Sequence, residues 1–247
     1  KGKRTDDETI AKAFDYVLKI KKIPIVVNDS RGFYTSRVFS TYTNEGLALL
    51  AEGNHPQEIE TAGKKAGMPV GPLAVIDEIN LGLVSQIRKQ TRKDLATEGK
   101  ELPLIPADQV IDLMTEKINR LGRAQGGGFY EYPENGKKYL WPELQTHFPI
   151  SKDPLTQDQM IERILFIQAI EAIRAYEENV VTSVAEANIG SIFGWGFSPE
   201  KGGTLQFIND YGIKKFEKRS QELYKKYGKR FTPPKMLIKM ASNKETF

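Results

Sequence analysis

The side chains best suited to chemistry follow an apolar run near the start of the chain. Residues 23–28 read Ile-Pro-Ile-Val-Val-Asn, and residues 29–37 read Asp-Ser-Arg-Gly-Phe-Tyr-Thr-Ser-Arg. The first run predicts a buried β-strand, and the second predicts a turn into a helix. Because ligands bind beyond the carboxyl ends of strands in open α/β sheets, the Ser36 hydroxyl is a candidate hydrogen-bond donor. A serine at a helix start is also a common N-cap, and position alone favours that structural role.

The other polar residues form no complete catalytic set. The chain has no cysteine, which excludes disulfides, thiolate metal sites and a thiol nucleophile. Its two histidines, His55 and His147, lie far apart in the sequence, so a histidine-rich metal site or a Ser-His-Asp triad is poorly supported. Asp77 and Glu78 are adjacent and point to different faces of a helix, so they do not predict a paired general acid and base.

The predicted strand needs neighbours to satisfy its backbone donors and acceptors. No comparable apolar run occurs elsewhere in the 247 residues. We therefore expect the partners of residues 23–28 to lie outside this sequence. The chain is expected to be the C-terminal part of a larger protein, cut inside an α/β domain, and its start at Lys1 without a methionine agrees with that expectation.

Most of the remaining sequence predicts helices, with one hairpin. Periodicity and capping residues predict helices over residues 5–18, 36–51, 56–67, 73–76, 81–98, 108–120, 156–179, 183–194 and 213–228, and a short one after residue 234. Between residues 122 and 149, aromatic residues alternate around a Pro-Glu-Asn-Gly turn, which predicts a small β-hairpin. The glycines at 126–128 precede no Lys-Ser/Thr pair and no helix, which argues against a phosphate loop.

Two parts of the sequence resemble each other. Arg37 and Glu45 in the first part match Arg163 and Glu171 in the second, and the segment 71–77 matches 203–209. The shared order of long helix, short helix and glycine-containing loop predicts a duplicated helical unit. We expect one copy to pack its apolar face on the other.

The chain carries 36 basic and 32 acidic residues, and the excess of positive charge lies late in the sequence. The basic residues concerned are Lys214, Lys215, Lys218, Arg219, Lys225, Lys226, Lys229 and Arg230. The simpler interpretation is the solvated face of an amphipathic helix; the sharper one is an anion-binding surface for a phosphate-bearing ligand or an acidic partner. No apolar stretch approaches the ~20 residues of a membrane-spanning helix, so none is expected.

Several motifs run through nearly the whole chain in one order. They are Ile25–Phe33 with Arg37; Asn44-Glu45; Gly67–Pro72 with Asp77; Gly128–Tyr132; and Gly194–Phe197 with Gly202-Gly203. Together they resemble the C-terminal region of 3-hydroxyacyl-CoA dehydrogenases, specifically the long α-subunit type of the bacterial fatty-acid oxidation complex. That long form carries two copies of its helical domain, which agrees with the internal repeat.

The resemblance implies a parent enzyme of fatty-acid β-oxidation that oxidises the 3-hydroxyl of an acyl-CoA to a ketone and passes hydride to NAD. It implies that a Rossmann domain, with the dinucleotide loop and a catalytic His–Glu pair, and an enoyl-CoA hydratase domain precede this region; neither set of motifs occurs here. The fragment alone is then expected to be inactive, because hydride transfer needs the cofactor held in place. A thiolase subunit is a further candidate partner, and the expected location is cytoplasmic.

The resemblance also implies which residues serve the substrate. Those expected to line the acyl-CoA cleft are Gly32, Phe33, Arg37, Pro69, Gly71 and Pro72. The family usually has asparagine just before the arginine, where its amide assists the reacting oxygen. This sequence has Ser36 there, and its hydroxyl is shorter but still donates one hydrogen bond. No residue of the fragment is expected to bind the cofactor or a metal.

We therefore predict a mainly α fold of the 6-phosphogluconate dehydrogenase C-terminal-like type. Residues 1–30 are the expected remnant of the Rossmann domain, 31–121 and 156–247 the two helical domains, and 122–155 a connector with the hairpin. The alternative is a non-catalytic helical interaction module that binds through the basic helix after Ile213. No recognised nucleic-acid motif accompanies that charge, so no nucleic-acid partner is expected.

Overall fold

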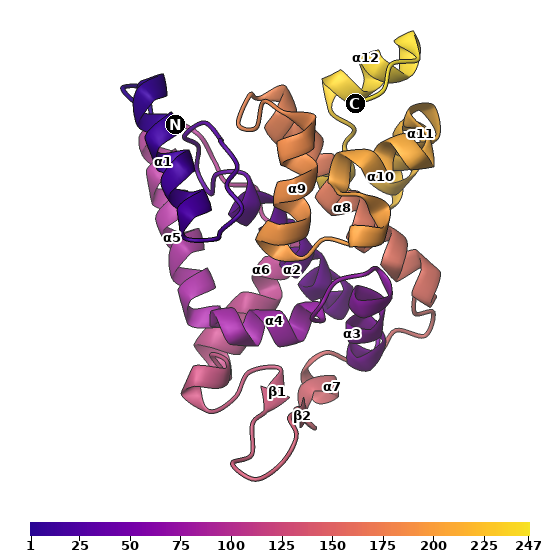
Figure 1. Ribbon diagram of the computed structural model, residues 1–247. Coiled ribbons are helices and arrows are strands. Elements are labelled where there is room, and N and C mark those ends of the chain that lie inside the picture. The colour runs from indigo at the N-terminus through magenta and orange to yellow at the C-terminus, as the bar shows by residue number, and fades with distance from the viewer. The chain divides into compact units, whose positions relative to one another are not determined.

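The computed structural model describes residues 1–247, and almost all of its regular structure is helical (Figure 1). The α-helices are α1 (Asp7–Lys19), α2 (Thr35–Ala51), α3 (Pro56–Lys65), α4 (Pro72–Ile79), α5 (Leu81–Thr97), α6 (Pro106–Asp112), α7 (Leu144–His147), α8 (Gln157–Glu177), α9 (Val184–Trp195), α10 (Thr204–Tyr211), α11 (Ile213–Tyr227) and α12 (Lys235–Asn243). The short elements are the π-helix η1 (Leu113–Lys117) and the 3₁₀-helices η2 (Arg123–Gln125), η3 (Pro199–Lys201) and η4 (Lys229–Phe231).

The one sheet is the predicted hairpin. Strands β1 (Tyr130–Glu131) and β2 (Tyr139–Leu140) pair antiparallel, with Tyr130 opposite Leu140. The expectation of a mainly helical chain with a small hairpin between its helical parts is confirmed. No helix combines the length and the hydropathy needed to cross a lipid bilayer.

The prediction of a strand over residues 23–28 was wrong. Only Val27 adopts β-pairing, in an isolated antiparallel bridge with Val181. The Asn28 N–H donates to the carbonyl of Val180 at 2.8 Å, and the Val26 N–H donates to the Glu186 carboxylate at 3.1 Å. These backbone groups therefore find partners inside the chain. The sequence analysis missed this because the segment after α8 offers only two valines, too few to predict a strand.

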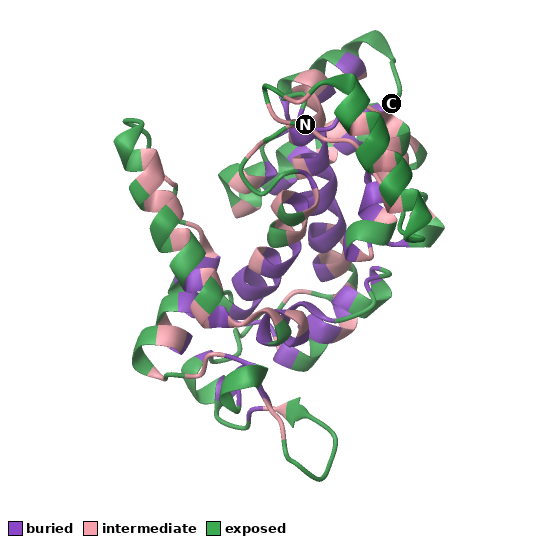
Figure 2. Ribbon diagram, turned by 60° about the vertical axis from the view of Figure 1, so that its left-hand side comes forward, coloured by how far each residue is buried: buried purple, intermediate pink, exposed green.

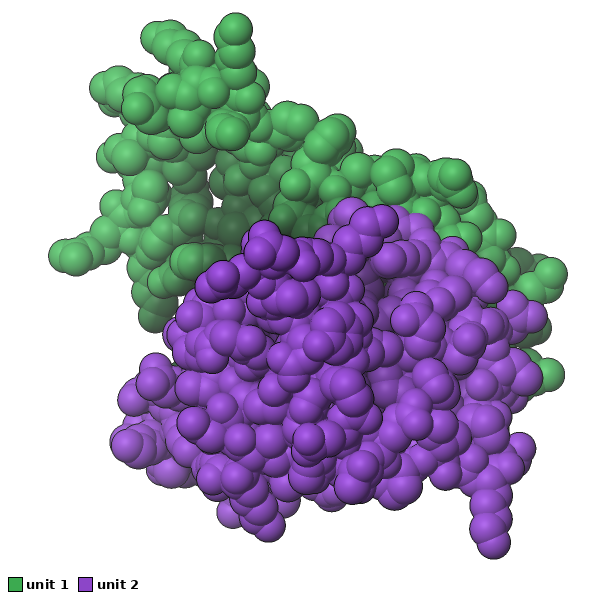
Figure 3. All heavy atoms as spheres, turned by 90° about the horizontal axis from the view of Figure 1, so that it is seen from below, with its two compact units in different colours: residues 1–41, 165–247 green, residues 42–164 purple.

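The chain divides into two compact units, coloured separately in Figure 3. Unit 1 comprises residues 1–41 and 165–247, and unit 2 comprises residues 42–164. Both divisions fall inside long helices, because α2 is divided after Thr41 and α8 after Ile164. Each unit therefore contains the opening turns of one long helix together with the remainder of the other.

Long, apolar helices supply the buried side chains of each unit (Figure 2). In unit 2 the later part of α2 buries Leu47, Leu49 and Leu50 almost completely. In unit 1 the later part of α8 does the same with Ile170 and Ile173. Both segments are apolar on most sides, as expected for helices enclosed by neighbouring elements.

Helix α1 differs from these helices because it buries no residue. Its sequence is amphipathic as predicted, yet Tyr16 and Leu18 are 63% and 51% exposed. The Asp6 carboxylate caps the helix by accepting from the Thr9 N–H at 2.7 Å, which lowers the pKa of Asp6. Helix α1 is thus locally well formed while its apolar stripe stays accessible.

Candidate functional site

A tight turn in unit 1 leads into α2. The Phe33 N–H donates to the carbonyl of Ser30 at 2.9 Å, and the Arg37 N–H donates to that of Gly32 at 3.1 Å. Gly32 and Phe33 have φ angles of 75° and 48°, in the left-handed region. Glycine adopts this conformation without cost, whereas a bulky residue such as phenylalanine rarely does. The turn leaves the Phe33 side chain 54% exposed.

Tyr34 anchors this turn to the rest of unit 1. Its side chain is fully buried, with its hydroxyl 3.0 Å from the carbonyl of Ala187 and 3.1 Å from the Thr204 hydroxyl. Its ring meets Trp195 edge to face, with 5.4 Å between the ring centroids. Burial raises the pKa of Tyr34, so the phenol stays protonated and keeps a proton to donate.

Ser36 lies in the first turn of α2, one residue after the helix begins at Thr35. It is therefore not the capping residue that its sequence position favoured. Its side chain is exposed, and no hydrogen bond within the chain engages its hydroxyl. A hydroxyl at the start of a long helix, free of protein partners, is available to donate to a ligand oxygen.

Arg37 is held by two carboxylates from the later part of α8, within unit 1. Its Nε donates to Glu171 at 2.5 Å, and its two terminal nitrogens bind Glu178 at 2.6 and 3.0 Å. Burial by itself would lower the pKa of Arg37, but the two carboxylates outweigh it and raise the pKa. The guanidinium thus fixes the start of α2, next to Ser36.

A second part of the predicted site lies in unit 2, at the start of α4. Gly71 is the N-cap, and Pro72 is the first helical residue. Proline is favoured at that position because its φ angle is fixed near the helical value and the N–H that it lacks would have no partner within the helix. One Glu60 carboxylate oxygen accepts from the N–H groups of Leu73 and Ala74, at 2.7 and 3.3 Å. A side chain at position 71 would meet the same carboxylate, with its Cβ at 2.5 Å, and would displace it from these hydrogen bonds.

The other Glu60 oxygen accepts from the Tyr130 hydroxyl at 2.8 Å, which ties the start of α4 to the hairpin. Near the end of α4, Asp77 accepts from the N–H groups of Phe129 and Tyr130, both at 2.9 Å. Burial raises the pKa of both carboxyl groups, that of Asp77 to about 6, against the lowering effect of these donors. The hairpin therefore holds α4 through two buried acids.

The segment that runs from Gly32 through α4 to the first strand of the hairpin matches a known family. Residues 32–132 match the sequence model of the 3-hydroxyacyl-CoA dehydrogenase C-terminal domain. Over these residues the chain is similar to the C-terminal domains of 3-hydroxyacyl-CoA dehydrogenases. The resemblance stated from the sequence is confirmed for these residues.

Two solved structures share the fold over almost the whole chain. The first is 3-hydroxybutyryl-CoA dehydrogenase from Escherichia coli K12, with a TM-score of 0.73 and 18% identity, over 98% of this chain and 66% of that one. The second is the dehydrogenase part of multifunctional enzyme 1 from C. elegans, with a TM-score of 0.65 and 21% identity, over 97% of this chain and 54% of that one. The chain thus spans about two thirds and about half of the lengths of these structures.

The predicted site residues fall into two groups. Unit 1 brings together Gly32, Phe33, Ser36 and Arg37 at the start of α2. Unit 2 contains Pro69, Gly71 and Pro72, of which Pro69 is exposed while Gly71 and Pro72 are buried. A cleft-lining role for these residues stays a prediction.

The sequence analysis missed three residues that position these groups: Tyr34, Glu60 and Tyr130. A single acid on a short helix, such as Glu60, reads as a surface residue, so no signal in the sequence marked it. Asp77 was predicted only to point to a different helix face from Glu78; the structure shows that it is buried, with 1% of its surface exposed. The aromatic run at 129–132 was the available clue, because buried tyrosine hydroxyls need polar partners.

The glycine run at residues 126–128 does not fit the pyrophosphate of a dinucleotide cofactor. The one run of glycines, 126–128, leads into the hairpin, and a side chain at Gly128 would collide with the Asp77 carboxylate. A carboxylate at this position would repel a pyrophosphate group. The chain therefore offers no NAD site at its glycine-rich segment.

Proposed function

We propose that this chain is the C-terminal, substrate-side part of an NAD-dependent 3-hydroxyacyl-CoA dehydrogenase of fatty-acid β-oxidation. The complete enzyme oxidises a 3-hydroxyacyl-CoA to a 3-ketoacyl-CoA. The observation that carries the proposal is the exposed, unpartnered Ser36 hydroxyl on the first turn of α2, inside a segment that matches the dehydrogenase family. Acyl-CoA is the proposed ligand of this region.

In this proposal Ser36 donates a hydrogen bond to the substrate oxygen that changes between hydroxyl and ketone. Negative charge on that oxygen is stabilised by a donor placed before the reaction and by the positive end of the α2 dipole. Tyr34 and Arg37 act as positioning residues, because both fix the start of the helix on which Ser36 lies. Gly32, Phe33, Pro69, Gly71 and Pro72 are proposed to line the acyl-CoA cleft.

The hydride acceptor NAD, and the acid–base pair that removes the hydroxyl proton, are proposed to belong to a preceding Rossmann domain. The amphipathic helix α1, which buries none of its residues, supports this proposal because its apolar stripe is free to pack on such a domain. Both matching structures are also longer than this chain. An enoyl-CoA hydratase domain, a thiolase subunit as partner and a cytoplasmic location are further parts of the proposal.

We also propose the domain division expected from the sequence: a Rossmann remnant at 1–30, helical copies at 31–121 and 156–247, and a connector at 122–155. Equivalent hydrogen bonds in the two copies support it. Asn188 caps α10 by accepting from the N–H groups of Leu205 and Gln206, at 2.9 and 3.1 Å. Glu60 caps α4 in the same way.

The test compares the chain alone with the chain fused behind the dinucleotide-binding domain of a related dehydrogenase. The assay follows the reduction of acetoacetyl-CoA by NADH. We expect no turnover by the chain alone and turnover by the fusion. Turnover by the chain alone, or a folded fusion that binds NADH but gives no turnover, would contradict the proposal.

A further inference from the structure

The first half of α11 presents lysines that form no ion pair with an acidic side chain. Lys214, Lys215 and Lys218 are exposed on this helix, and Lys244 is exposed just after α12. No hydrogen bond or ion pair within the chain engages any of these four ammonium groups. We call these four residues the lysine cluster.

The carboxylates nearest to the lysine cluster have other partners. Glu222 binds Arg219 at 2.6 Å, Glu245 accepts from the Asn243 side chain at 3.0 Å, and Glu217 accepts from Gln221. Lys214 and Lys218 are four residues apart on one helix, a spacing at which like charges repel. The helix dipole adds to this repulsion, because its positive end lies where these lysines begin.

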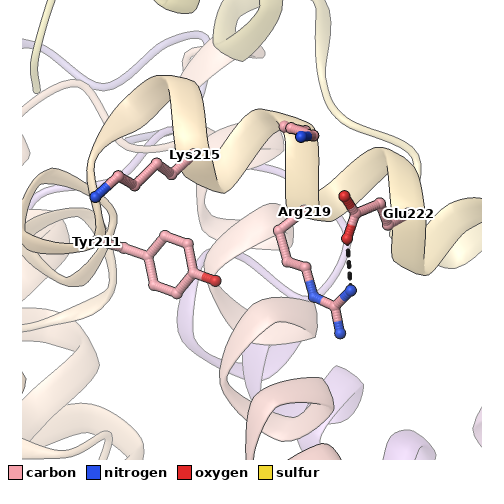
Figure 4. Close-up of a pocket in the computed structure, with 5 residues that line it drawn as sticks. Tyr211, Lys215, Arg219 and Glu222 are labelled. Carbon is pink, nitrogen blue, oxygen red and sulfur yellow. Dashed lines mark hydrogen bonds and ion pairs between the residues drawn. The ribbon is translucent and has the colours of Figure 1, made fainter.

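Two adjoining pockets open at the lysine cluster, both in unit 1. One, of about 430 Å³, is lined by Tyr211, Lys215, Lys218, Arg219 and Glu222. In Figure 4 the Lys215 and Arg219 side chains extend from α11 to either end of the Tyr211 ring. The other pocket, of about 530 Å³, shares Lys215 and Lys218 and adds Lys214, Lys244 and the Glu245 carboxylate around an apolar floor that includes Ile213 and Ala241.

The position of the lysine cluster is fixed by the core beneath it. The Phe216 ring of α11 stacks on Phe166 of α8, with 4.2 Å between the centroids and 6° between the planes. The Tyr211 ring meets Phe166 edge to face at 5.1 Å. The backbone that carries the α11 lysines is therefore held by aromatic packing. Fixed positions of the lysines favour binding of one specific ligand over nonspecific electrostatic attraction of anions.

We propose that the two pockets form one binding site for a small organic phosphate that carries at least two phosphate groups. The shared Lys215 and Lys218 bind its phosphates, and the apolar floor at Ile213 and Ala241 receives its organic part. The shared lysines and the adjoining apolar floor favour a compact ligand with a charged part and an apolar part over an acidic protein surface. This site is separate from the Ser36 region and does not depend on the function proposed above.

The test is isothermal titration calorimetry of the full chain with adenosine 3′,5′-bisphosphate as the probe. We expect saturable binding with one molecule per chain. The double variant Lys215→Gln/Lys218→Gln is expected to weaken binding at least tenfold. The control, Lys225→Gln/Lys235→Gln, removes the same charge from exposed positions outside both pockets and is expected to change binding less than twofold.

A second variant tests the apolar floor. Ala241→Glu places a second carboxylate in the second pocket, in addition to that of Glu245, and is expected to weaken binding at least tenfold, with the thermal unfolding midpoint unchanged. The proposal is overturned if the probe shows no saturable binding at millimolar concentration, or if both double variants weaken binding equally. It is also overturned if the chain binds phosphatidylglycerol vesicles but not the bisphosphate.

Discussion

Arg163 donates to Glu45 in unit 2 just as Arg37 donates to Glu171 in unit 1. The Arg163 Nε lies 2.7 Å from a Glu45 oxygen, and the Arg37 Nε lies 2.5 Å from a Glu171 oxygen. The internal repeat had matched the two arginines with each other and the two glutamates with each other. Each arginine thus binds the glutamate of the other copy, so the ion pairs are reciprocal.

The reciprocity extends to a second acid on each arginine. Arg163 also binds Glu52, and Arg37 also binds Glu178, at the corresponding place in the repeat. Solvent reaches the two sites differently, because the Arg163 and Glu45 side chains are 0% and 1% exposed while that of Glu178 is 53% exposed. The unit 2 site is therefore expected to contribute more to the stability of the chain.

The first prediction concerns Glu45→Gln. This change leaves the fully buried Arg163 with less compensating charge, so we expect the free energy of unfolding to fall by about 3 kcal/mol. Urea unfolding measures it. The control Glu116→Gln removes an exposed partner of Lys89 and is expected to have no measurable effect. Equal losses of unfolding free energy in the two variants would show that the buried ion pair contributes no more to stability than the exposed one.

The second prediction concerns the pH dependence that Asp77 contributes. Its pKa is raised from 3.8 to about 6 in the folded chain, mainly by burial. Between these values the folded state holds the proton more tightly, so this group stabilises the fold at low pH and the stabilisation is lost as the pH rises through about 6. Asp77→Asn does not titrate. The difference in unfolding free energy, wild type minus variant, is therefore expected to fall between pH 4 and pH 7.

The control for that experiment is Glu78→Gln, at the adjacent exposed position. This variant keeps the Asp77 carboxyl group, so the unfolding free energy of Glu78→Gln minus that of Glu78→Gln/Asp77→Asn is expected to fall over the same pH range. If both differences that remove Asp77 were constant, the carboxyl group of Asp77 would not be perturbed in the folded chain.

The third prediction concerns the Tyr34 hydroxyl. Tyr34→Phe leaves the buried Ala187 carbonyl without this donor and is expected to cost about 1–2 kcal/mol of unfolding free energy. A double-mutant cycle with Thr204→Val, measured by urea unfolding, is expected to give a coupling energy of about 0.5–1 kcal/mol. Strict additivity of the two substitutions would mean that the two hydroxyls do not interact.

The fourth prediction tests Ser36 in the active fusion enzyme. Ser36→Ala removes the proposed donor to the substrate oxygen and is expected to lower kcat about 10²-fold with little change in KM. Ser36→Asn restores a donor and is expected to keep activity. Ser40→Ala, which removes another exposed hydroxyl from α2, is the matched control. A drop in kcat as large for Ser40→Ala would assign the effect to the helix and not to the Ser36 hydroxyl.

Local patterns predicted much of the secondary structure. The aromatic alternation around residues 133–136 predicted the hairpin, and the long helices end within a few residues of the predicted limits. The segment 23–28 was wrong because an apolar run does not reveal its partner, and here the pairing is with Val181, far away in the sequence. For Ser36 the predicted start of the helix was one residue too late, because α2 begins at Thr35. A shift of one residue at a helix boundary decides whether a serine is the capping residue or has a free hydroxyl.

The candidate site was less predictable because its supports are long-range contacts. The repeat showed that Arg37 corresponds to Arg163, but correspondence within a repeat does not say which residues touch. Glu60 and Asn188 cap equivalent helices, yet they differ in residue type, so no sequence pattern links them. Such contacts depend on how the chain folds back on itself, which helical periodicity alone does not encode.

Each unit holds the opening turns of one long helix and the remainder of the other, and this arrangement determines what a cut in the polypeptide does. A break between residues 155 and 156 leaves one piece holding Glu45 without Arg163, and another holding Glu171 without Arg37. Neither piece is then a self-sufficient module, although each carries an entire sequence repeat. Mixed together, the two pieces have complementary charged and apolar surfaces, so this protein is suited to reconstitution from halves rather than to dissection into separate domains.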